Sequence, residues 1–185
     1  MRMFSAATGY LRVGLLVTAT ALSGGTALVG GALAAQPESM AARVQRLEDR
    51  EQILELLTSY GATLDRHDFA AFGQLFAEDA EYGGGAGAPT RGRTAIQAQL
   101  EKQITSNPAN LPPPNSHLSF NPSIRISGDY ATAHSLGAYV APDPATKTTR
   151  MVFFVSYDDQ FVRRDGRWQF LKRVLGSGPP PAATR

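Results

Sequence analysis

The sequence places an acidic residue, Asp65, at the end of a long segment with an apolar stripe, a setting that suits proton-transfer chemistry. Leu57, Gly61 and Leu64 recur at three- and four-residue spacing, which predicts a helix with one buried face over residues 40–66. A carboxylate in the last turn faces the negative end of the helix dipole, and partial burial further disfavours its charge. Asp65 is therefore a candidate proton acceptor.

A structural interpretation of the same region stays open. The run Asp65-Arg66-His67-Asp68 also suits a solvated helix end, with Asp68 capping a second helix. His117 opens a later strand, where the residues alone indicate a surface or hydrogen-bonded structural histidine. Alternation along one strand puts His117 on the polar side, and that side is solvent or cavity depending on the rest of the sheet.

Three helices are expected in the first half of the chain. The long helix over residues 40–66 should bury a stripe that begins at Leu47 and expose the charged run 48–51. A second helix is expected over about 69–76 and a third over about 95–104. Together these helices would have to position Asp65, which lies at the end of the first helix.

Beyond residue 115 the apolar period changes from helical to two, which predicts strands. Leu118, Phe120, Ile124 and Ile126 are expected to share one buried face, whereas His134 alternates with small residues and belongs on the outer face. Helices followed by antiparallel strands predict an α+β fold with the helices on one face of a curved sheet. The expected strands cover about 80–82, 116–126, 130–140, 151–161 and 168–175.

The first 35 residues have the composition of a signal peptide. Arg2 and Arg12 precede an apolar and small-residue run over 13–29, and Ala32-Leu33-Ala34 fits a cleavage site. We therefore expect export to the periplasm or the medium, without stable membrane association after cleavage; an uncleaved anchor is the alternative. Residues 36–175 would form one domain, and residues 176–185 a disordered tail.

Composition narrows the possible chemistry. The chain has no Cys, which removes disulfides, thiol catalysis and a lipoprotein anchor. Its net charge is only +2 and its basic residues are scattered, so no nucleic-acid partner is expected. The three His lack the spacing of metal ligands and no Gly-Lys-Ser or Gly-Lys-Thr phosphate loop occurs, so neither a metal nor a cofactor is expected.

Several motifs together resemble one known family. They are YGATLDRHDF, LFAEDAEY, RGRTAI, SHLSFNPSIRISGDYATAHS and FVRRDGRWQFLKRVL. On these motifs the chain is identified as a SnoaL-like member of the nuclear transport factor 2-like superfamily, over residues 40–175. The resemblance implies a cone-shaped fold. In it a curved sheet, mainly antiparallel but mixed, wraps around the N-terminal helix, and three helices enclose an apolar pocket.

The same motifs are similar to those of bile-acid 7α-dehydratase, lindane dehydrochlorinase and scytalone dehydratase, which eliminate a small leaving group. This resemblance implies a catalytic Asp65–His117 dyad, with Tyr60 donating to a substrate oxygen and Arg173 stabilising negative charge. Tyr60 and Asp65 are about 140° apart on an ideal helix, so both reach one pocket only if the helix unwinds near Gly61. The expected substrate-binding residues are Leu57, Phe72, Phe76, Tyr82, Tyr139 and Phe153.

The resulting hypothesis is a cofactor-independent lyase, a dehydratase or dehydrohalogenase, acting on a small hydrophobic cyclic substrate. Two alternatives stay open: an isomerase or polyketide-cyclase reaction that uses Asp65 alone, and a ligand-binding module without catalysis. The resemblance also implies a homo-oligomer, a trimer or a dimer.

Overall fold

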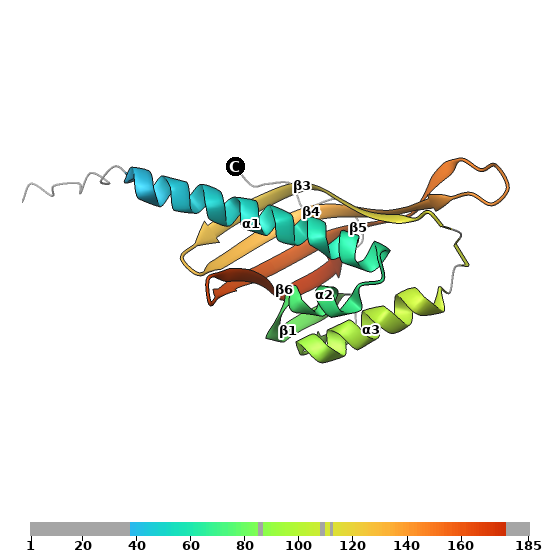
Figure 1. Cartoon of the computed structure of the whole chain (residues 1–185), viewed down its shortest axis with the longest axis horizontal. Coiled ribbons are helices and arrows are strands. Elements are labelled where there is room, and N and C mark those ends of the chain that lie inside the picture. Colours follow the sequence, from blue (N-terminus) through green and yellow to red (C-terminus); the bar gives the residue numbers. More distant parts are fainter. Residues whose placement is uncertain (1–37, 85–86, 108–109, 112, 177–185) are drawn as a thin grey trace, which may run out of the picture. The chain divides into compact units, whose positions relative to one another are not determined.

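The computed structural model describes residues 38–84, 87–107, 110–111 and 113–176, which form three helices and a six-stranded sheet (Figure 1). The strand order is β2-β1-β6-β5-β4-β3; β1 and β6 run parallel, and the other neighbours are antiparallel. In chain order the elements are α1 (Met40–Asp65), α2 (Phe69–Gln74), β1 (Phe76–Gly84), β2 (Thr90–Arg91), α3 (Arg93–Ser106), β3 (Ser116–Ser127), β4 (Tyr130–Pro142), β5 (Thr149–Arg164) and β6 (Arg167–Gly176).

The expected α+β fold with a curved, mixed sheet is confirmed. The inner face of the sheet is the one that packs on the helices: α1 lies along β3 and β6, and α3 packs against β1 (Figure 1). Large side chains from the helices and strands fill the space between these layers, and several are completely buried. The core includes Ile53, Leu64, Ile96, Phe161 and Phe170.

The ends of the chain can be compared with expectation only in part. The expected signal peptide, residues 1–35, and residues 177–185 of the expected tail lie outside the described residues. Gly176, the first residue of that expected tail, instead ends β6 and pairs with Ser156 of β5. Within the described ranges, no helix is both long and apolar enough to cross a membrane.

The sheet contains one strand that was not expected, β2, and its neighbour β1 is longer than expected. α2 ends at Gln74, and Phe76, expected to be helical, begins β1. β1 extends to Gly84 and lies parallel to β6. The expectation of a short strand over 80–82 therefore identified the right segment but not its length or its parallel pairing.

The N-terminal half of α1 also differs from expectation. Leu47 is 64% exposed, so the buried stripe does not begin there, and Asp49, expected in solvent, is only 4% exposed. The Asp49 carboxylate accepts hydrogen bonds from Arg163 Nη1 at 2.6 Å and Trp168 Nε1 at 3.0 Å. Because these donors come from β5 and β6, Asp49 joins α1 to two strands of the sheet.

A β-bulge in β3 decides which of its side chains face inward. The pairing with β4 passes from Phe120–Leu136 to Ser123–His134, so Asn121 and Pro122 lie opposite a single residue. Asn121 adopts a φ of 55° there. An extra residue reverses the alternation, because successive side chains of a strand point to opposite faces.

This bulge corrects the expected burial of β3. Ile124 and Ile126 pack against the core as expected, but Leu118 and Phe120 point to the outer face, and Leu118 is 46% exposed. His117, which precedes the bulge, faces inward with its cross-strand partner Tyr139. The polar side of this part of β3 therefore faces the interior.

We predict that Asp49→Ala lowers the free energy of unfolding by about 1–3 kcal/mol, because Trp168 Nε1 loses its acceptor inside the protein. Urea denaturation measures the change. Glu48→Ala, at the exposed neighbouring position, is the matched control and should stay within about 0.5 kcal/mol of wild type. Equal losses in the two variants would contradict the role given to Asp49.

Candidate active site

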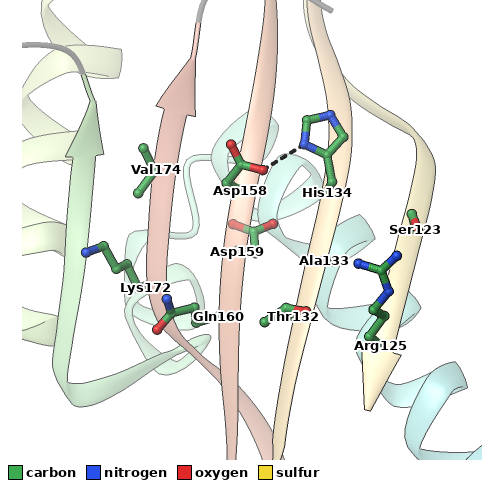
Figure 2. A pocket seen from close by; sticks show the side chains of 10 residues that line it. All are labelled: Ser123, Arg125, Thr132, Ala133, His134, Asp158, Asp159, Gln160, Lys172 and Val174. Atoms are coloured by element: carbon green, nitrogen blue, oxygen red, sulfur yellow. Dashed lines mark hydrogen bonds and ion pairs between the residues drawn. The ribbon is translucent and has the colours of Figure 1, made fainter. Parts of the chain in front are cut away.

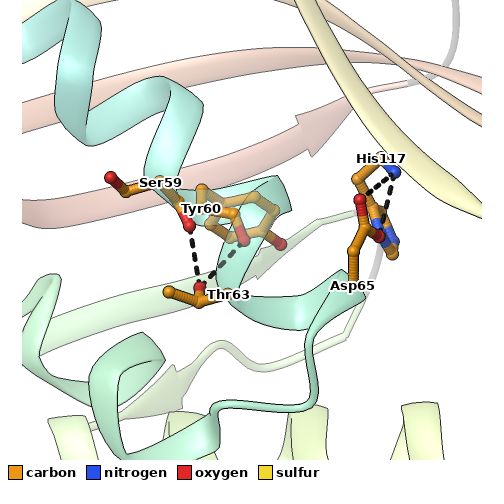
Figure 3. A network of polar contacts seen from close by, with 5 residues as sticks. All are labelled: Ser59, Tyr60, Thr63, Asp65 and His117. Carbon is orange, nitrogen blue, oxygen red and sulfur yellow. Dashed lines mark hydrogen bonds and ion pairs between the residues drawn. The ribbon is translucent and has the colours of Figure 1, made fainter.

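The end of α1 and the start of β3 meet through Asp65 and His117 (Figure 3). His117 Nδ1 lies 2.7 Å from Asp65 Oδ1, and the backbone N–H of His117 lies 3.0 Å from each carboxylate oxygen. An ionised carboxylate only accepts hydrogen bonds, so Nδ1 is the donor in this contact, and in the neutral ring Nε2 then carries the lone pair. The contact expected between these side chains is present.

Gly61 lets the two elements approach each other. A Cβ at this position would lie 2.8 Å from the backbone oxygen of His117, closer than real Cβ atoms come, and 3.0 Å from its Cβ. Gly61 precedes Asp65 by four residues, so both lie on the same side of α1. The absence of a side chain at Gly61 therefore allows Asp65 to reach His117.

The structure bears out one part of the structural interpretation of the Asp65–Asp68 run and not the other. Asp68 accepts a hydrogen bond from the backbone N–H of Ala71 at 3.0 Å and caps α2, as expected. Asp65, however, is bonded to His117 and is not a solvated helix end. α1 stays helical through Asp65, so the unwinding that would let Tyr60 and Asp65 share one pocket is absent; Tyr60 lines the cavity described below, and Asp65 does not.

A cavity of about 250 Å³ adjoins this pair. The His117 ring lies on its wall, with ring centroids 4.4 Å from Tyr139 and 6.4 Å from Phe153. Within the described residues, His117 Nε2 has no hydrogen-bond partner and remains available to a ligand. Most of the remaining lining is aliphatic or phenolic: Leu64, Leu100, Ile104, Leu111, Val152 and Leu175, with Tyr60, Tyr82 and Tyr157.

Three of the six expected substrate-binding residues do not line this cavity. Tyr82, Tyr139 and Phe153 do, whereas Leu57, Phe72 and Phe76 are buried in the core. Phe72 and Phe76 pack on each other with ring centroids 5.2 Å apart. Helical spacing identified these side chains as inward-facing, but it does not separate packing against other side chains from facing an empty space.

Arg173 does not reach the cavity either. Its side chain is fully buried and forms a bidentate ion pair with Asp159, with Nε–Oδ1 and Nη2–Oδ2 distances of 2.8 Å. Its Cζ lies 4.1 Å from the ring centroids of both Tyr60 and Tyr157. Burial lowers the pKa of Arg173, but the Asp159 charge and hydrogen bonds outweigh burial, so the net direction is upward. The expectation that Arg173 contacts a ligand directly is therefore corrected. Its guanidinium is instead enclosed by aromatic rings.

Four phenol side chains line the cavity, those of Tyr60, Tyr82, Tyr139 and Tyr157, and sequence reasoning missed Tyr157 as a cavity residue. Tyr60 and Tyr82 hydroxyls are 2.9 Å apart and share one hydrogen bond. Burial raises the pKa of Tyr60, Tyr82 and Tyr157, so all three are neutral hydrogen-bond donors at neutral pH. One sequence signal could have indicated that Tyr157 reaches the cavity. Tyr157 lies on β5 opposite Ser135 of β4, and such a small neighbour leaves room for a large inward-facing ring.

His134 lies on the outer face, as alternation along β4 indicates (Figure 2). Its Nδ1 is 2.7 Å from Asp158 Oδ1, beside Arg125, Gln160 and Lys172. None of these residues lines the cavity beside His117. In the part of the chain that the structure describes, no group of three His, Asp or Glu side chains is placed to hold a metal ion.

Comparison with known proteins identifies the family. The model of the SnoaL-like domain matches residues 45–174. The chain belongs to this family. A protein of Mycobacterium tuberculosis, described as uncharacterised, is 30% identical over 133 residues, which cover 71% of this chain and 86% of the relative.

Solved structures show the same fold for this SnoaL-like chain. An NTF2-like protein from Novosphingobium aromaticivorans has a TM-score of 0.67 and 27% identity, covering 80% of this chain and 96% of its own. A candidate scytalone dehydratase from the same species has a TM-score of 0.60, 23% identity and coverage of 72% and 86%. A hexachlorocyclohexane dehydrochlorinase from Novosphingobium barchaimii has a TM-score of 0.59, 17% identity and coverage of 77% and 96%.

We predict that Gly61→Ala separates α1 from β3, because the added methyl group overlaps the His117 backbone. Stability should fall by about 1–3 kcal/mol, and the NMR signal of the His117 Nδ1 proton should shift or broaden. Gly87→Ala is the control, since a Cβ there meets nothing within 4 Å. A Gly61→Ala protein with unchanged stability and an unchanged His117 signal would show that the close approach is unimportant.

The tyrosines predict a loss of stability in alkali. Since burial raises the pKa of Tyr157 in the folded chain above the ordinary tyrosine value of about 10, the unfolded chain loses this proton first. The free energy of unfolding should therefore fall as pH rises above about 10, by up to about 1.4 kcal/mol per pH unit for each such tyrosine. Urea denaturation between pH 8.5 and 11 should show a shallower fall for Tyr157→Phe than for wild type, and identical slopes would contradict this.

Proposed function

We propose that the protein is a cofactor-independent lyase that eliminates water or hydrogen halide from a small hydrophobic cyclic substrate. The observation that carries this proposal is the position of His117. Its Nδ1 is bonded to Asp65 at 2.7 Å, while its ring lines a mostly apolar cavity with Nε2 available. This is the arrangement of a general base and the carboxylate that orients it.

The proposed reaction uses this nitrogen in two steps. His117 Nε2 takes a proton from a substrate carbon, the C–H electron pair becomes the new C=C bond, and the leaving group departs with the electrons of its own bond. Asp65 stabilises the imidazolium that forms. In a dehydration, Nε2–H returns the proton to the departing hydroxyl, so that water leaves and His117 is neutral again. Halide loss leaves this proton to be released to solvent.

The surroundings of His117 suit such a reaction. Only 13% of its side chain and 20% of that of Asp65 are exposed, so the pair acts in a region of low dielectric constant, where charge interactions are strong. We assign Tyr60 and Tyr82 to hydrogen bonding with a polar group of the substrate, because both line the cavity. Arg173 is assigned an indirect, electrostatic role, since it lies behind the Tyr60 and Tyr157 rings.

The comparisons support the reaction class without naming a substrate. The chain belongs to the SnoaL-like family. Proteins with the same fold include a candidate scytalone dehydratase and a hexachlorocyclohexane dehydrochlorinase. Both names denote elimination reactions. The alternative reaction in which Asp65 alone transfers the proton is less favoured, because both carboxylate oxygens are already in contact with His117 N–H groups.

We predict that Asp65→Asn and His117→Gln each lower turnover by about a hundredfold or more, while the fold survives. The double variant should lose little beyond the worse single variant, because residues that act as a unit are not additive. Activity is found by screening hydroxylated and halogenated cyclic compounds and following loss of water or hydrogen halide by mass spectrometry.

The outer face supplies a matched control. His134 and Asp158 form the same kind of pair at the same 2.7 Å distance but do not line the cavity. Asp158→Asn and His134→Gln should therefore leave turnover close to wild type. Undiminished elimination by His117→Gln would refute the mechanism. Deuterium exchange into a substrate that loses no leaving group would favour an isomerase, and a ligand that emerges unchanged a binding module.

A further inference from the structure

The start of α1 presents large apolar side chains to solvent. Residues 40–48 are all exposed, and in Figure 1 this part of the helix extends beyond the strands. Met40 is 69% exposed, Val44 45% and Leu47 64%. An α-helix turns by about 100° per residue, so these three positions lie within about 60° of one another around the helix. Met40, Val44 and Leu47 therefore form one row, called the exposed stripe below.

The exposed stripe points away from the rest of the fold. Asp49 follows Met40 by nine positions, about two and a half turns, so its buried side chain lies on the opposite side of α1. That side faces the sheet, because Asp49 accepts hydrogen bonds from Arg163 and Trp168. Another molecule can therefore reach the exposed stripe without breaking a contact of the fold.

The spacing of the exposed stripe is that of a two-stranded coiled coil. Met40 and Leu47 are seven residues apart and take the d positions of a heptad, and Val44 takes the a position between them. A β-branched residue at a with Leu at d favours two parallel helices. The next a position is Glu51, which ends the apolar run. A contact through so short a run is weak and depends on protein concentration.

Charged residues flank the exposed stripe with opposite signs. Arg43 and Arg50 occupy g positions on one side, and Glu48 and Glu55 occupy e positions on the other; all four are exposed. Within the described residues none of them forms an ion pair. In a parallel pair of helices each g position faces the e position five residues later in the second helix, so Arg meets Glu twice on each side. An antiparallel pair would bring like charges together.

We propose that two copies of this chain form a dimer in which their α1 helices pair in parallel through the exposed stripe, over residues 40–55. Arg43 of each copy then faces Glu48 of the other. The helices diverge beyond this range, since β3 lies beside α1 at Gly61. The interface stands apart from the proposed function, because Asp65 lies at the other end of α1.

A second copy suits the exposed stripe better than a lipid surface does. Helices that lie on membranes carry Lys and Arg along their polar face. Here Glu48 and Glu55 line one whole side of the stripe, and Glu51 continues its centre. A surface with one acidic and one basic side is complementary to a copy of itself in the parallel orientation.

Sedimentation velocity of the purified full chain over a range of concentrations tests the association. The wild type should form a dimer whose share rises with concentration. Leu47→Glu should weaken it at least about tenfold, because the variant loses a buried apolar contact in each copy. Leu47 is exposed in the single chain, so the variant should keep the circular dichroism spectrum of the wild type. Gln52→Glu adds the same charge at an exposed position off the stripe and should leave the association unchanged.

Charge exchange tests the parallel orientation. Arg43→Glu and Glu48→Arg each place like charges opposite one another and should weaken the dimer about 3- to 10-fold. The double variant exchanges the two charges and should return to the affinity of the wild type. An equal mixture of the two single variants should also associate as the wild type does. A double variant as weak as the single ones would overturn the proposed orientation.

An engineered thiol tests the register, since the chain has no Cys. Val44→Cys should cross-link two copies under mild oxidation, because a positions face each other across a parallel pair. Ala42→Cys is the matched control, exposed on the opposite side of the helix, and should not cross-link. A dimer that Leu47→Glu leaves intact, or that Val44→Cys does not cross-link, would overturn the proposal. So would a chain that stays monomeric, whether its stripe binds lipid vesicles or its own N-terminal residues.

Discussion

The carboxylate of Asp65 binds both the backbone N–H and the ring Nδ1 of His117, and the geometry of the site depends on this contact. It joins the last residue of α1 to the start of β3, and Gly61 allows the approach. At the other end, Asp49 joins the same helix to β5 and β6. Asp49 and Asp65 are 16 positions apart, about 24 Å at 1.5 Å per residue, so two polar contacts, one buried and one partly buried, set the helix direction across the sheet.

Between these contacts the interior combines aromatic packing with enclosed charge. The Arg173–Asp159 ion pair is completely buried, and the rings of Tyr60, Tyr157 and Phe170 lie within 4.4 Å of the guanidinium carbon. A bidentate pair of this kind offsets the cost of removing both charges from water only with good geometry. The arrangement places the Arg173–Asp159 pair behind the phenol groups, and in the proposed function His117 is the base. Electrostatic groups that are fixed before a reaction need no rearrangement during it.

Much of the fold and part of the site could be predicted from local pattern and from resemblance. Periodicity located α1 and the later strands, and it placed Asp65 at a helix end; resemblance paired it with His117. The bulge at Asn121 was not predictable, because the apolar alternation of β3 continues across it in sequence while the backbone reverses the faces.

Other features depend on residues far away in the chain. Asp49 is buried because donors more than 110 positions later reach it, and a hydropathy pattern cannot contain that information. Arg173 lies outside the cavity because of another residue that a local pattern does not reveal: Asp159, on the neighbouring strand, binds its side chain. Phe72 and Phe76 were assigned correctly to the inside but incorrectly to the cavity, a distinction that only the packed structure makes.

The central claim is that Asp65 holds His117 with its proton on Nδ1 and its lone pair on Nε2. Nitrogen-15 NMR of the histidine side chains tests this directly, with the His117→Gln variant assigning the signal, at a pH where the imidazole is neutral. The account predicts a protonated Nδ1 and an unprotonated Nε2 for His117, and loss of this preference in Asp65→Asn. A proton on Nε2 in the wild type, or a His117 signal that Asp65→Asn leaves unchanged, would contradict it.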